Sequence, residues 1–146
     1  PARGRGLLGG CGYSIDLARA LVGHPLERVT SHVGRGADPG ATILLGFEDG
    51  SRATIVYETR GPGSLPKERV EVTSQGRFAR VEDWRILTSR AWPQLGSSRT
   101  LRPERGHAQL LARMLGACRG QARAPIPIDE IEEVARATIQ AARGTS

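Results

Sequence analysis

Two polar side chains near the start of the chain have types and a spacing that could support chemistry. Tyr13 and Asp16 are three residues apart, so they share a face if this segment is helical. The phenol of Tyr13 could donate a proton, and Asp16 could accept a hydrogen bond from a substrate hydroxyl. An acid near the start of a helix is also favoured by the helix dipole alone, so both interpretations of Asp16 stay open.

Two cationic side chains are further candidates for substrate binding. Lys67 is the sole lysine and follows a loop rich in glycine and proline, where it could bind a phosphate or a carboxylate. It could also be a solvated charge that discourages pairing at a strand edge. His107 lies at the start of a predicted helix, on its apolar side, and could be either a structural or a catalytic histidine.

The remaining histidines and the two cysteines do not indicate a metal site. His24 and His32 lack partners at metal-ligand spacing, and Cys11 and Cys118 form neither a metal pattern nor a disulfide framework. Cys118 falls on an apolar helix face and is predicted to be a buried free thiol. Free thiols favour a reducing, cytoplasmic location. The chain has no membrane-length apolar run and no apolar signal region, which predicts a soluble protein.

The charge balance raises the alternative of a nucleic-acid binder. The net charge is +6, with 21 lysines and arginines. The arginines are spread along the chain, and only 4% of residues are aromatic, so no basic stripe with interleaved aromatic residues is present. Nucleic-acid binding therefore stays a minor alternative, and nucleic acid is not expected as a partner.

Periodicity along the chain predicts helices at both ends and strands between them. Apolar spacing predicts a helix over residues 14–22 that ends at Gly23, while residues 1–10 are too rich in glycine for a regular element. Alternating strands follow, with turns at Asp49-Gly50 and Gln75-Gly76. Two further helices are predicted over residues 107–118 and from Asp129 onward, the second opened by a capping box of Asp129 and Glu132.

This order of elements predicts an α+β fold. We expect an open, mostly antiparallel or mixed β-sheet with helices packed on one face. The length of 146 residues predicts a single compact domain over residues 1–146.

A glycine pattern at the start resembles a dinucleotide-binding turn. Gly4, Gly6 and Gly9 match G-x-G-x-x-G, but that turn needs a strand before it and β-α repeats after it. Only three residues precede Gly4, so we interpret the segment as a flexible lead into the first helix. No cofactor-binding residue and no metal ligand is predicted in this chain.

Three segments, in this order, resemble the C-terminal domain of the glucose–fructose oxidoreductase / inositol dehydrogenase (Gfo/Idh/MocA) family. They are the glycine-rich lead into GYSIDLARALVG, the hairpin and strand of GFEDGSRATIVYETRGPGSLPKERVEV, and the closing ERGHAQLLARMLGACRGQARAPIPIDEIEEVARATIQAA. The second is similar to the family's F-x-D-G-S-x-x-T-I strand pair. The resemblance covers essentially the whole chain.

The resemblance implies that this chain is the substrate-binding and oligomerisation domain of an NAD(P)-dependent oxidoreductase. An N-terminal Rossmann domain that binds NAD or NADP would be absent from these residues, so the chain alone would be inactive and bind no cofactor. Substrates would be sugars, sugar nucleotides or polyols oxidised at a secondary alcohol. A homo-oligomer formed through the sheet is expected, and a membrane is not. The alternative is a non-catalytic relative that serves as a dimerising or ligand-binding module.

The resemblance also marks the positions where the acid/base residues would lie. The family often carries an Asp and, four residues later, a His that serves as general acid/base; here these positions fall on Gly9 and Tyr13. Tyr13 is therefore the catalytic candidate, and Asp16, Lys67 and His107 are the substrate-binding candidates. The family's usual catalytic lysine would lie in the Rossmann domain.

Overall fold

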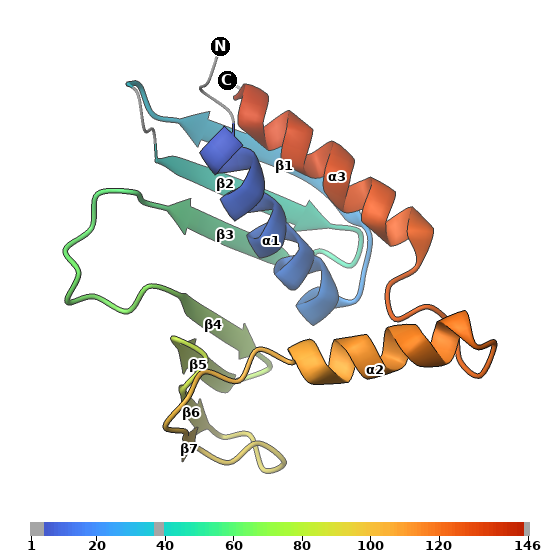
Figure 1. Ribbon diagram of the computed structural model, residues 1–146. Coiled ribbons are helices and arrows are strands. Elements are labelled where there is room, and N and C mark those ends of the chain that lie inside the picture. The colour runs from blue at the N-terminus through green and yellow to red at the C-terminus, as the bar shows by residue number, and fades with distance from the viewer. Residues whose placement is uncertain (1–4, 37–39, 145–146) are drawn as a thin grey trace. The chain divides into compact units, whose positions relative to one another are not determined.

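The residues that the structure describes form three helices and strands that pair antiparallel. The computed structural model describes residues 5–36 and 40–144. In chain order the elements are α1 (Arg5–Val22), β1 (Leu26–Val33), β2 (Ala41–Phe47), β3 (Arg52–Tyr57), β4 (Arg69–Ser74), β5 (Arg77–Glu82), β6 (Ile86–Arg90), β7 (Ser98–Arg99), α2 (His107–Cys118) and α3 (Ile128–Arg143) (Figure 1). The predicted α+β class with antiparallel strands is confirmed.

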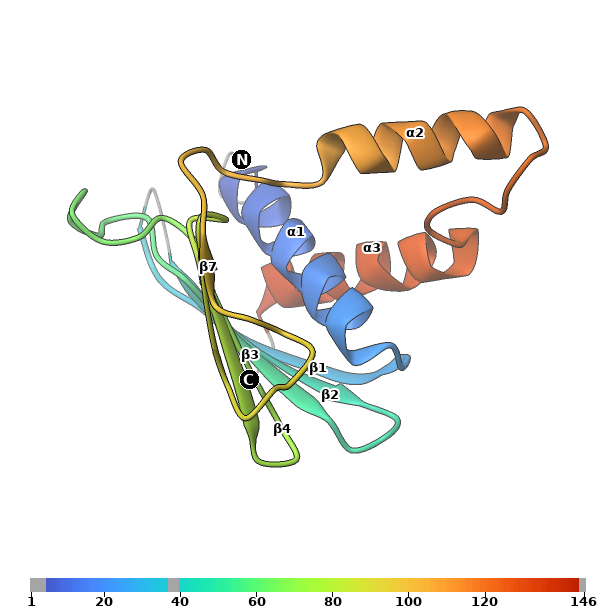
Figure 2. The same cartoon turned by 90° about the horizontal axis from the view of Figure 1, so that it is seen from below.

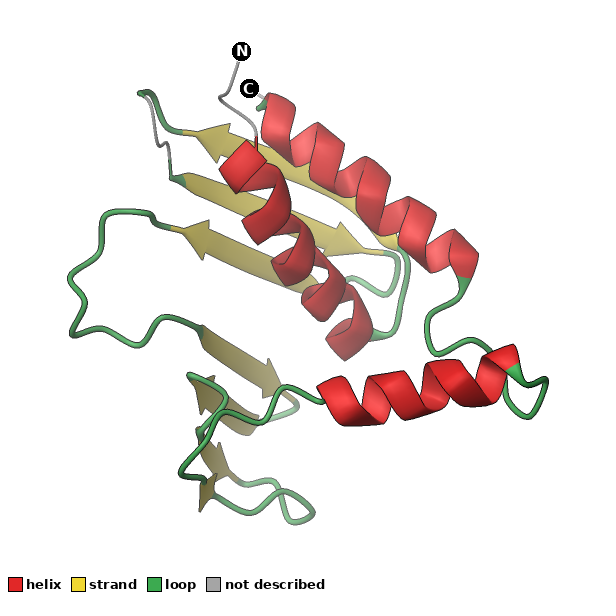
Figure 3. Ribbon diagram, viewed as in Figure 1, coloured by secondary structure: helices red, strands yellow, loops and turns green. Residues whose placement is uncertain are grey.

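The strands form two sheets, which lie in two compact units. The first unit comprises residues 1–60 and 126–146 and contains the sheet β1-β2-β3; the second comprises residues 61–125 and contains the sheet β4-β5-β6-β7 (Figure 3). The single domain over residues 1–146 stays a prediction. Among the described residues, no helix is long and apolar enough to cross a membrane.

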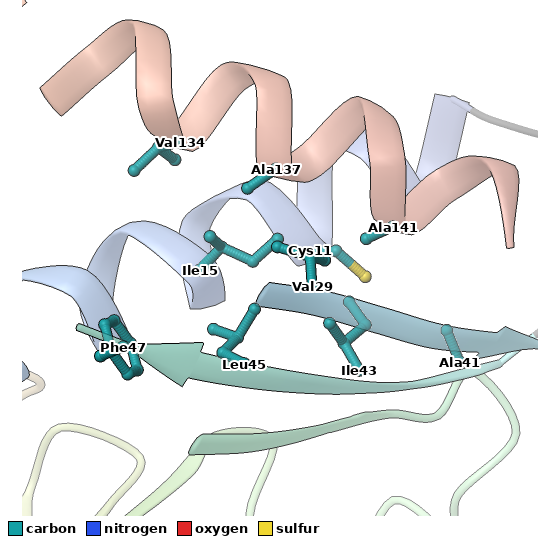
Figure 4. Close-up of a cluster of buried hydrophobic side chains, with 10 residues drawn as sticks. All are labelled: Cys11, Ile15, Val29, Ala41, Ile43, Leu45, Phe47, Val134, Ala137 and Ala141. Atoms are coloured by element: carbon teal, nitrogen blue, oxygen red, sulfur yellow. The ribbon is translucent and has the colours of Figure 1, made fainter. Parts of the chain in front are cut away.

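The core of the first unit lies between one face of its sheet and the helices α1 and α3. Along β2 every second residue is buried, and Ile43, Leu45 and Phe47 form the predicted inner face. Cys11 and Ile15 from α1 meet these side chains, together with small and β-branched residues from α3 (Figure 4). Viewed from below, both helices lie on the same side of the sheet β1-β2-β3 (Figure 2). The predicted placement of helices on one face is confirmed in this unit.

The first helix starts much earlier than its glycines predict. We expected no regular element before residue 11, but α1 begins at Arg5 and contains Gly6 and Gly9. Gly4 lies outside the described residues. The part of the G-x-G-x-x-G spacing that the structure describes is therefore helical, and the predicted flexible lead is wrong from Arg5 onward.

Close packing explains why glycines are accommodated in α1. A Cβ on Gly10 would lie 2.4 Å from Cε2 of Tyr57, and one on Gly12 would lie 3.4 Å from Cγ2 of Thr138. The bare backbone at these positions lets β3 and α3 approach the helix. A glycine inside a helix lowers the stability of that helix by about 1 kcal/mol relative to alanine. The close packing that the glycine permits offsets this loss.

The predicted tight turns are present. Gly50 has a φ of 81° in the turn between β2 and β3, and the amide and hydroxyl of Ser51 both donate to the Asp49 carboxylate. These hydrogen bonds hold the pKa of Asp49 below its usual value. Gln75 and Gly76 join β4 to β5 with φ values of 50° and 74°, the left-handed conformations that favour a twisted two-residue hairpin turn.

The predicted capping box at the last helix is wrong. Pro127 occupies the N-cap position in an extended conformation, α3 begins at Ile128, and no side chain caps it. Asp129 is therefore the second residue of the helix rather than its cap. Asp129 and Glu130 still place negative charge in the first turn, where the helix dipole favours it.

In the second unit, α2 contains no buried residue. Cys118 is exposed, so the prediction of a buried thiol is wrong. The apolar side chains of α2 are exposed too: Leu110, Leu111, Met114 and Leu115. Helical periodicity correctly predicts an apolar face, but the same pattern does not specify whether another element covers it.

Candidate functional site

Tyr13 and Asp16 lie on α1, one helical turn apart. Cys11 and Ile15 on the same helix point into the core, while Tyr13 is 50% exposed and Asp16 is partly exposed. Because α1 begins at Arg5, Asp16 is near the middle of the helix. An interaction with the dipole at the first turn therefore does not account for this acid. Its interpretation as a ligand of a substrate hydroxyl stays a prediction.

An ion-pair network fixes α1 against α3 and β1. Nε of Arg19 lies 3.0 Å from Oε2 of Glu133, and its Nη1 lies 3.4 Å from Oε1 of Glu130. The second carboxylate oxygen of Glu133 accepts a hydrogen bond from the backbone N–H of Leu26. The helix that carries Tyr13 and Asp16 is thus held by partners more than a hundred residues away, which no local sequence pattern indicates.

Cys11 is not positioned to act as a nucleophile. It is buried in the core of the first unit, and burial raises the pKa of its thiol. A thiol in such surroundings stays protonated and is chemically inert. Among the described residues no group of three histidines, cysteines or carboxylates is placed to hold a metal ion.

In the second unit, the carboxylate of Asp83 connects the Lys67 segment to the turn between β5 and β6. Oδ1 of Asp83 accepts hydrogen bonds from the backbone N–H groups of Lys67 at 2.7 Å and Glu68 at 3.2 Å. The backbone N–H of Asp83 in turn donates to the Glu68 carbonyl at 2.8 Å. We call these three hydrogen bonds the Asp83 clamp. The clamp fixes the backbone of Lys67 and leaves its side chain exposed.

The turn that carries Asp83 has an unusual conformation. Asp83 and Trp84, between β5 and β6, have φ values of 50° and 55°, and for a bulky residue such as tryptophan this left-handed conformation is strained. The N–H of Arg85 closes the turn on the Glu82 carbonyl at 3.0 Å, and the N–H of Glu104 donates to the Trp84 carbonyl at 3.0 Å. Hydrogen bonds from both flanking segments thus hold this turn in place.

The same end of the sheet holds the segment that leads into His107. Nη2 of Arg105 lies 3.1 Å from Oε2 of Glu68, so residues 104–105 are bound both to the Asp83–Trp84 turn and to the residue after Lys67. His107 itself is the first residue of α2 and is exposed. It is therefore not a core histidine, although a structural role was one expectation. The structure brings the Lys67 and His107 segments together within the second unit.

Asp83→Ala is expected to lower the free energy of unfolding by about 2 kcal/mol, because two backbone N–H groups lose their acceptor and alanine disfavours a positive φ. Asp83→Asn is the matched control: it keeps an acceptor oxygen and tolerates this conformation, so a change within about 0.5 kcal/mol is expected. Urea unfolding of the two variants measures the difference. Equal stability of the Ala and Asn variants would show that the clamp contributes nothing.

A groove of about 490 Å³ lies along β1 and α3. Both acidic and basic side chains line its walls, and none of the predicted site residues does. Within it, Nε2 of Gln140 donates to the Val29 carbonyl at 3.1 Å. Side chains of α3 thus satisfy backbone groups of the edge strand β1, which is a common way to prevent pairing with another strand.

Comparison with known proteins gives structural matches only. Neither a protein-family model nor a curated protein matches this sequence. The UDP-N-acetylglucosamine 3-dehydrogenase GnnA from Acidithiobacillus ferrooxidans matches 92% of this chain with a TM-score of 0.71 and 19% identity. A dehydrogenase from Chromobacterium violaceum matches 91% with a TM-score of 0.70 and 18% identity.

A third structure matches the same fold with a lower TM-score. The WlbA dehydrogenase from Bordetella pertussis, in complex with NADH and UDP-GlcNAcA, matches 92% of this chain with a TM-score of 0.55 and 15% identity. This chain spans 46%, 44% and 41% of the three matched chains. At these identities the matches show a shared fold, and the chain corresponds to less than half of each dehydrogenase.

Proposed function

We propose that this chain is the substrate-side domain of a nicotinamide-dependent oxidoreductase that acts on a sugar nucleotide. The observation that carries the proposal is the match of 91–92% of the chain to two dehydrogenases at TM-scores of 0.70–0.71, over less than half of their length. The unmatched half of such an enzyme leaves room for a cofactor domain. The motifs that resemble the Gfo/Idh/MocA family support the same assignment independently of the fold.

The cofactor belongs to the companion domain in this proposal. A nicotinamide nucleotide needs a strand, a glycine turn and a helix N-terminus, whereas Gly6 and Gly9 lie within α1. Gly6 and Gly9 thus do not fit the glycine turn of a Rossmann-type cofactor site. The isolated chain is expected to show no saturable change in NADH or NADPH fluorescence on titration. Micromolar binding with one site per chain would contradict the division into two domains.

The residues of this chain would handle the substrate hydroxyl. Oxidation of a secondary alcohol requires a group that takes the hydroxyl proton. Tyr13, acting as a phenolate in the direction of alcohol oxidation, is proposed for that role because it is half exposed on α1 and stands where the family often has its histidine. Asp16, one turn along the same helix, would accept a hydrogen bond from the substrate. Lys67 and His107, both in the second unit, are also proposed as substrate-binding residues.

We further propose that copies of the protein associate through the outer face of the first sheet. Leu44 and Val56 lie on the face opposite the helices and are 51% and 65% exposed. Apolar side chains on an open sheet face favour contact with protein over contact with water. A dimer or larger species in sedimentation at several concentrations would agree with this proposal, and a clean monomer at high micromolar concentration would contradict it.

The second candidate function is that of a non-catalytic relative. It is favoured by Gly9 and Tyr13, which replace the acid and the histidine that the family often carries. In that case the domain would bind a ligand or hold subunits together without turnover. For either function we propose a cytoplasmic location, since both cysteines are free thiols, which suits a reducing compartment.

A further inference from the structure

One end of the second sheet carries several charged residues on three segments. These are the segment before β4 with Lys67, the turn between β5 and β6 with Arg85, and the segment after β7 with Arg102 (Figure 1). The strand pairing places them at the same end, because Arg69 pairs with Glu82 and Ile86 pairs with Arg99.

Hydrogen bonds hold the three segments together. The Asp83 clamp joins the first segment to the turn. Thr100 joins the turn to the third segment, because its N–H donates to the Arg85 carbonyl at 2.8 Å and its hydroxyl donates to the Arg102 carbonyl at 2.8 Å. Lys67, Arg85 and Arg102 are therefore carried on a preorganised backbone.

The acidic side chains at this end already have partners. Asp83 accepts the two backbone N–H groups of its clamp, Glu68 pairs with Arg105, and Glu104 accepts the Gly106 N–H. The carboxylate of Glu82 lies within 4 Å of Arg69 and Arg80. These acids are thus engaged locally.

Three cationic side chains at this end of the sheet, unlike the acids, have no ion-pair partner among the described residues. The side chains of Lys67, Arg85 and Arg102 are exposed, and within the described part of the chain they form no ion pair. Lys67, Arg85 and Arg102 thus lie on adjoining, ordered segments at one end of the sheet without a carboxylate partner, an arrangement suited to a multivalent anion. Arginine is especially suited to phosphate oxygens because its planar group can make two parallel hydrogen bonds.

We propose that Lys67, Arg85 and Arg102 form a subsite for the diphosphate group of a nucleoside diphosphate sugar. The choice of this ligand rests on the proposed function, while the positive site itself rests on the geometry of the second unit. The Asp83 clamp acts in this subsite as a positioning device for Lys67. The strained turn at Asp83 and Trp84 holds the segment that carries Arg85.

Titration calorimetry of the 146-residue chain with inorganic pyrophosphate tests the subsite. The wild type is expected to bind pyrophosphate more tightly than inorganic phosphate. The double variant Lys67→Gln/Arg102→Gln should bind pyrophosphate about 100-fold more weakly, since each lost charge-assisted contact corresponds to about tenfold in affinity. Arg77→Gln/Arg90→Gln removes the same charge from exposed residues at the opposite end of the same sheet, and a change of about twofold or less is expected there.

Two results would overturn the subsite. One is the absence of saturable pyrophosphate binding, and duplex DNA bound with a steep salt dependence in its place would indicate a nucleic-acid surface instead. The other is an equal loss of affinity in both double variants. Circular dichroism spectra of the variants check that they are folded. None of these results touches the proposed oxidoreductase function, which is tested by nicotinamide reduction in the complete protein.

Discussion

Tyr13→Phe is expected to lower the turnover number of the proposed complete oxidoreductase about 100-fold, the usual effect of losing a general acid/base. The substitution removes only the phenolic oxygen from a side chain that is half exposed on α1, and circular dichroism of the variant checks that the fold is retained. In the proposed mechanism the phenolate form of this side chain takes the proton from the substrate hydroxyl, as the hydride leaves to the nicotinamide, and becomes the neutral phenol. Steady-state kinetics with the wild type and the variant measure the effect.

The chain offers a matched control in its second tyrosine. Tyr57 packs against Gly10 and is partly buried, so Tyr57→Phe removes the same atom outside the proposed site and should leave turnover within about twofold. Tyr13→His should restore activity with a lower pH optimum, because imidazole titrates near pH ~6.5 and phenol near pH ~10. Unchanged turnover in Tyr13→Phe would remove Tyr13 from the mechanism.

Arg19→Met is expected to lower the free energy of unfolding by about 2 kcal/mol. The arginine side chain is only 13% exposed and neutralises Glu130 and Glu133, which are 20% and 24% exposed. Its loss would leave two carboxylates close together in a poorly solvated position, and one of them also holds the backbone of Leu26. Breaking fully buried pairs costs 3–5 kcal/mol, and partial exposure reduces that figure.

Arg136→Met is the matched control for this prediction. Its ion pair with Glu132 also involves α3, but the two side chains are 81% and 62% exposed. An exposed pair of this kind contributes about 0.5 kcal/mol or less. Urea unfolding of both variants gives the comparison, and similar losses of stability would show that the Arg19 network is no more important than a surface pair.

Local patterns in the sequence predict much of the first unit. The inner face of β2, with Ile43 and Leu45, follows from strict alternation, and the turn at Gly50 follows from an Asp-Gly pair between strands. These features depend on neighbours within a few residues. The same holds for the end of α1 at Gly23, which has the positive φ expected of a helix terminus.

Features that depend on distant partners could not be predicted. Glycines favour irregular structure in isolation, but Gly10 lies within α1, where the ring of Tyr57, nearly fifty residues later, occupies the space that a side chain on residue 10 would need. The Asp83 clamp also joins distant positions, because Asp83 lies 16 residues after Lys67 and 15 residues after Glu68. The sequence predicts a helix only from residue 14, just after Tyr13. The structure extends α1 back to Arg5, which places Tyr13 and Asp16 on one helix and removes the dipole explanation for Asp16.

We propose that this chain supplies the substrate side of a sugar-nucleotide oxidoreductase. The most direct test is to express the complete reading frame that contains these residues and to follow absorbance at ~340 nm with NAD or NADP and UDP-N-acetylglucosamine or its uronic acid. We predict nicotinamide reduction that depends on the sugar nucleotide, and none with the 146-residue chain alone. A complete protein that binds neither the nicotinamide nucleotide nor the sugar nucleotide would contradict the account.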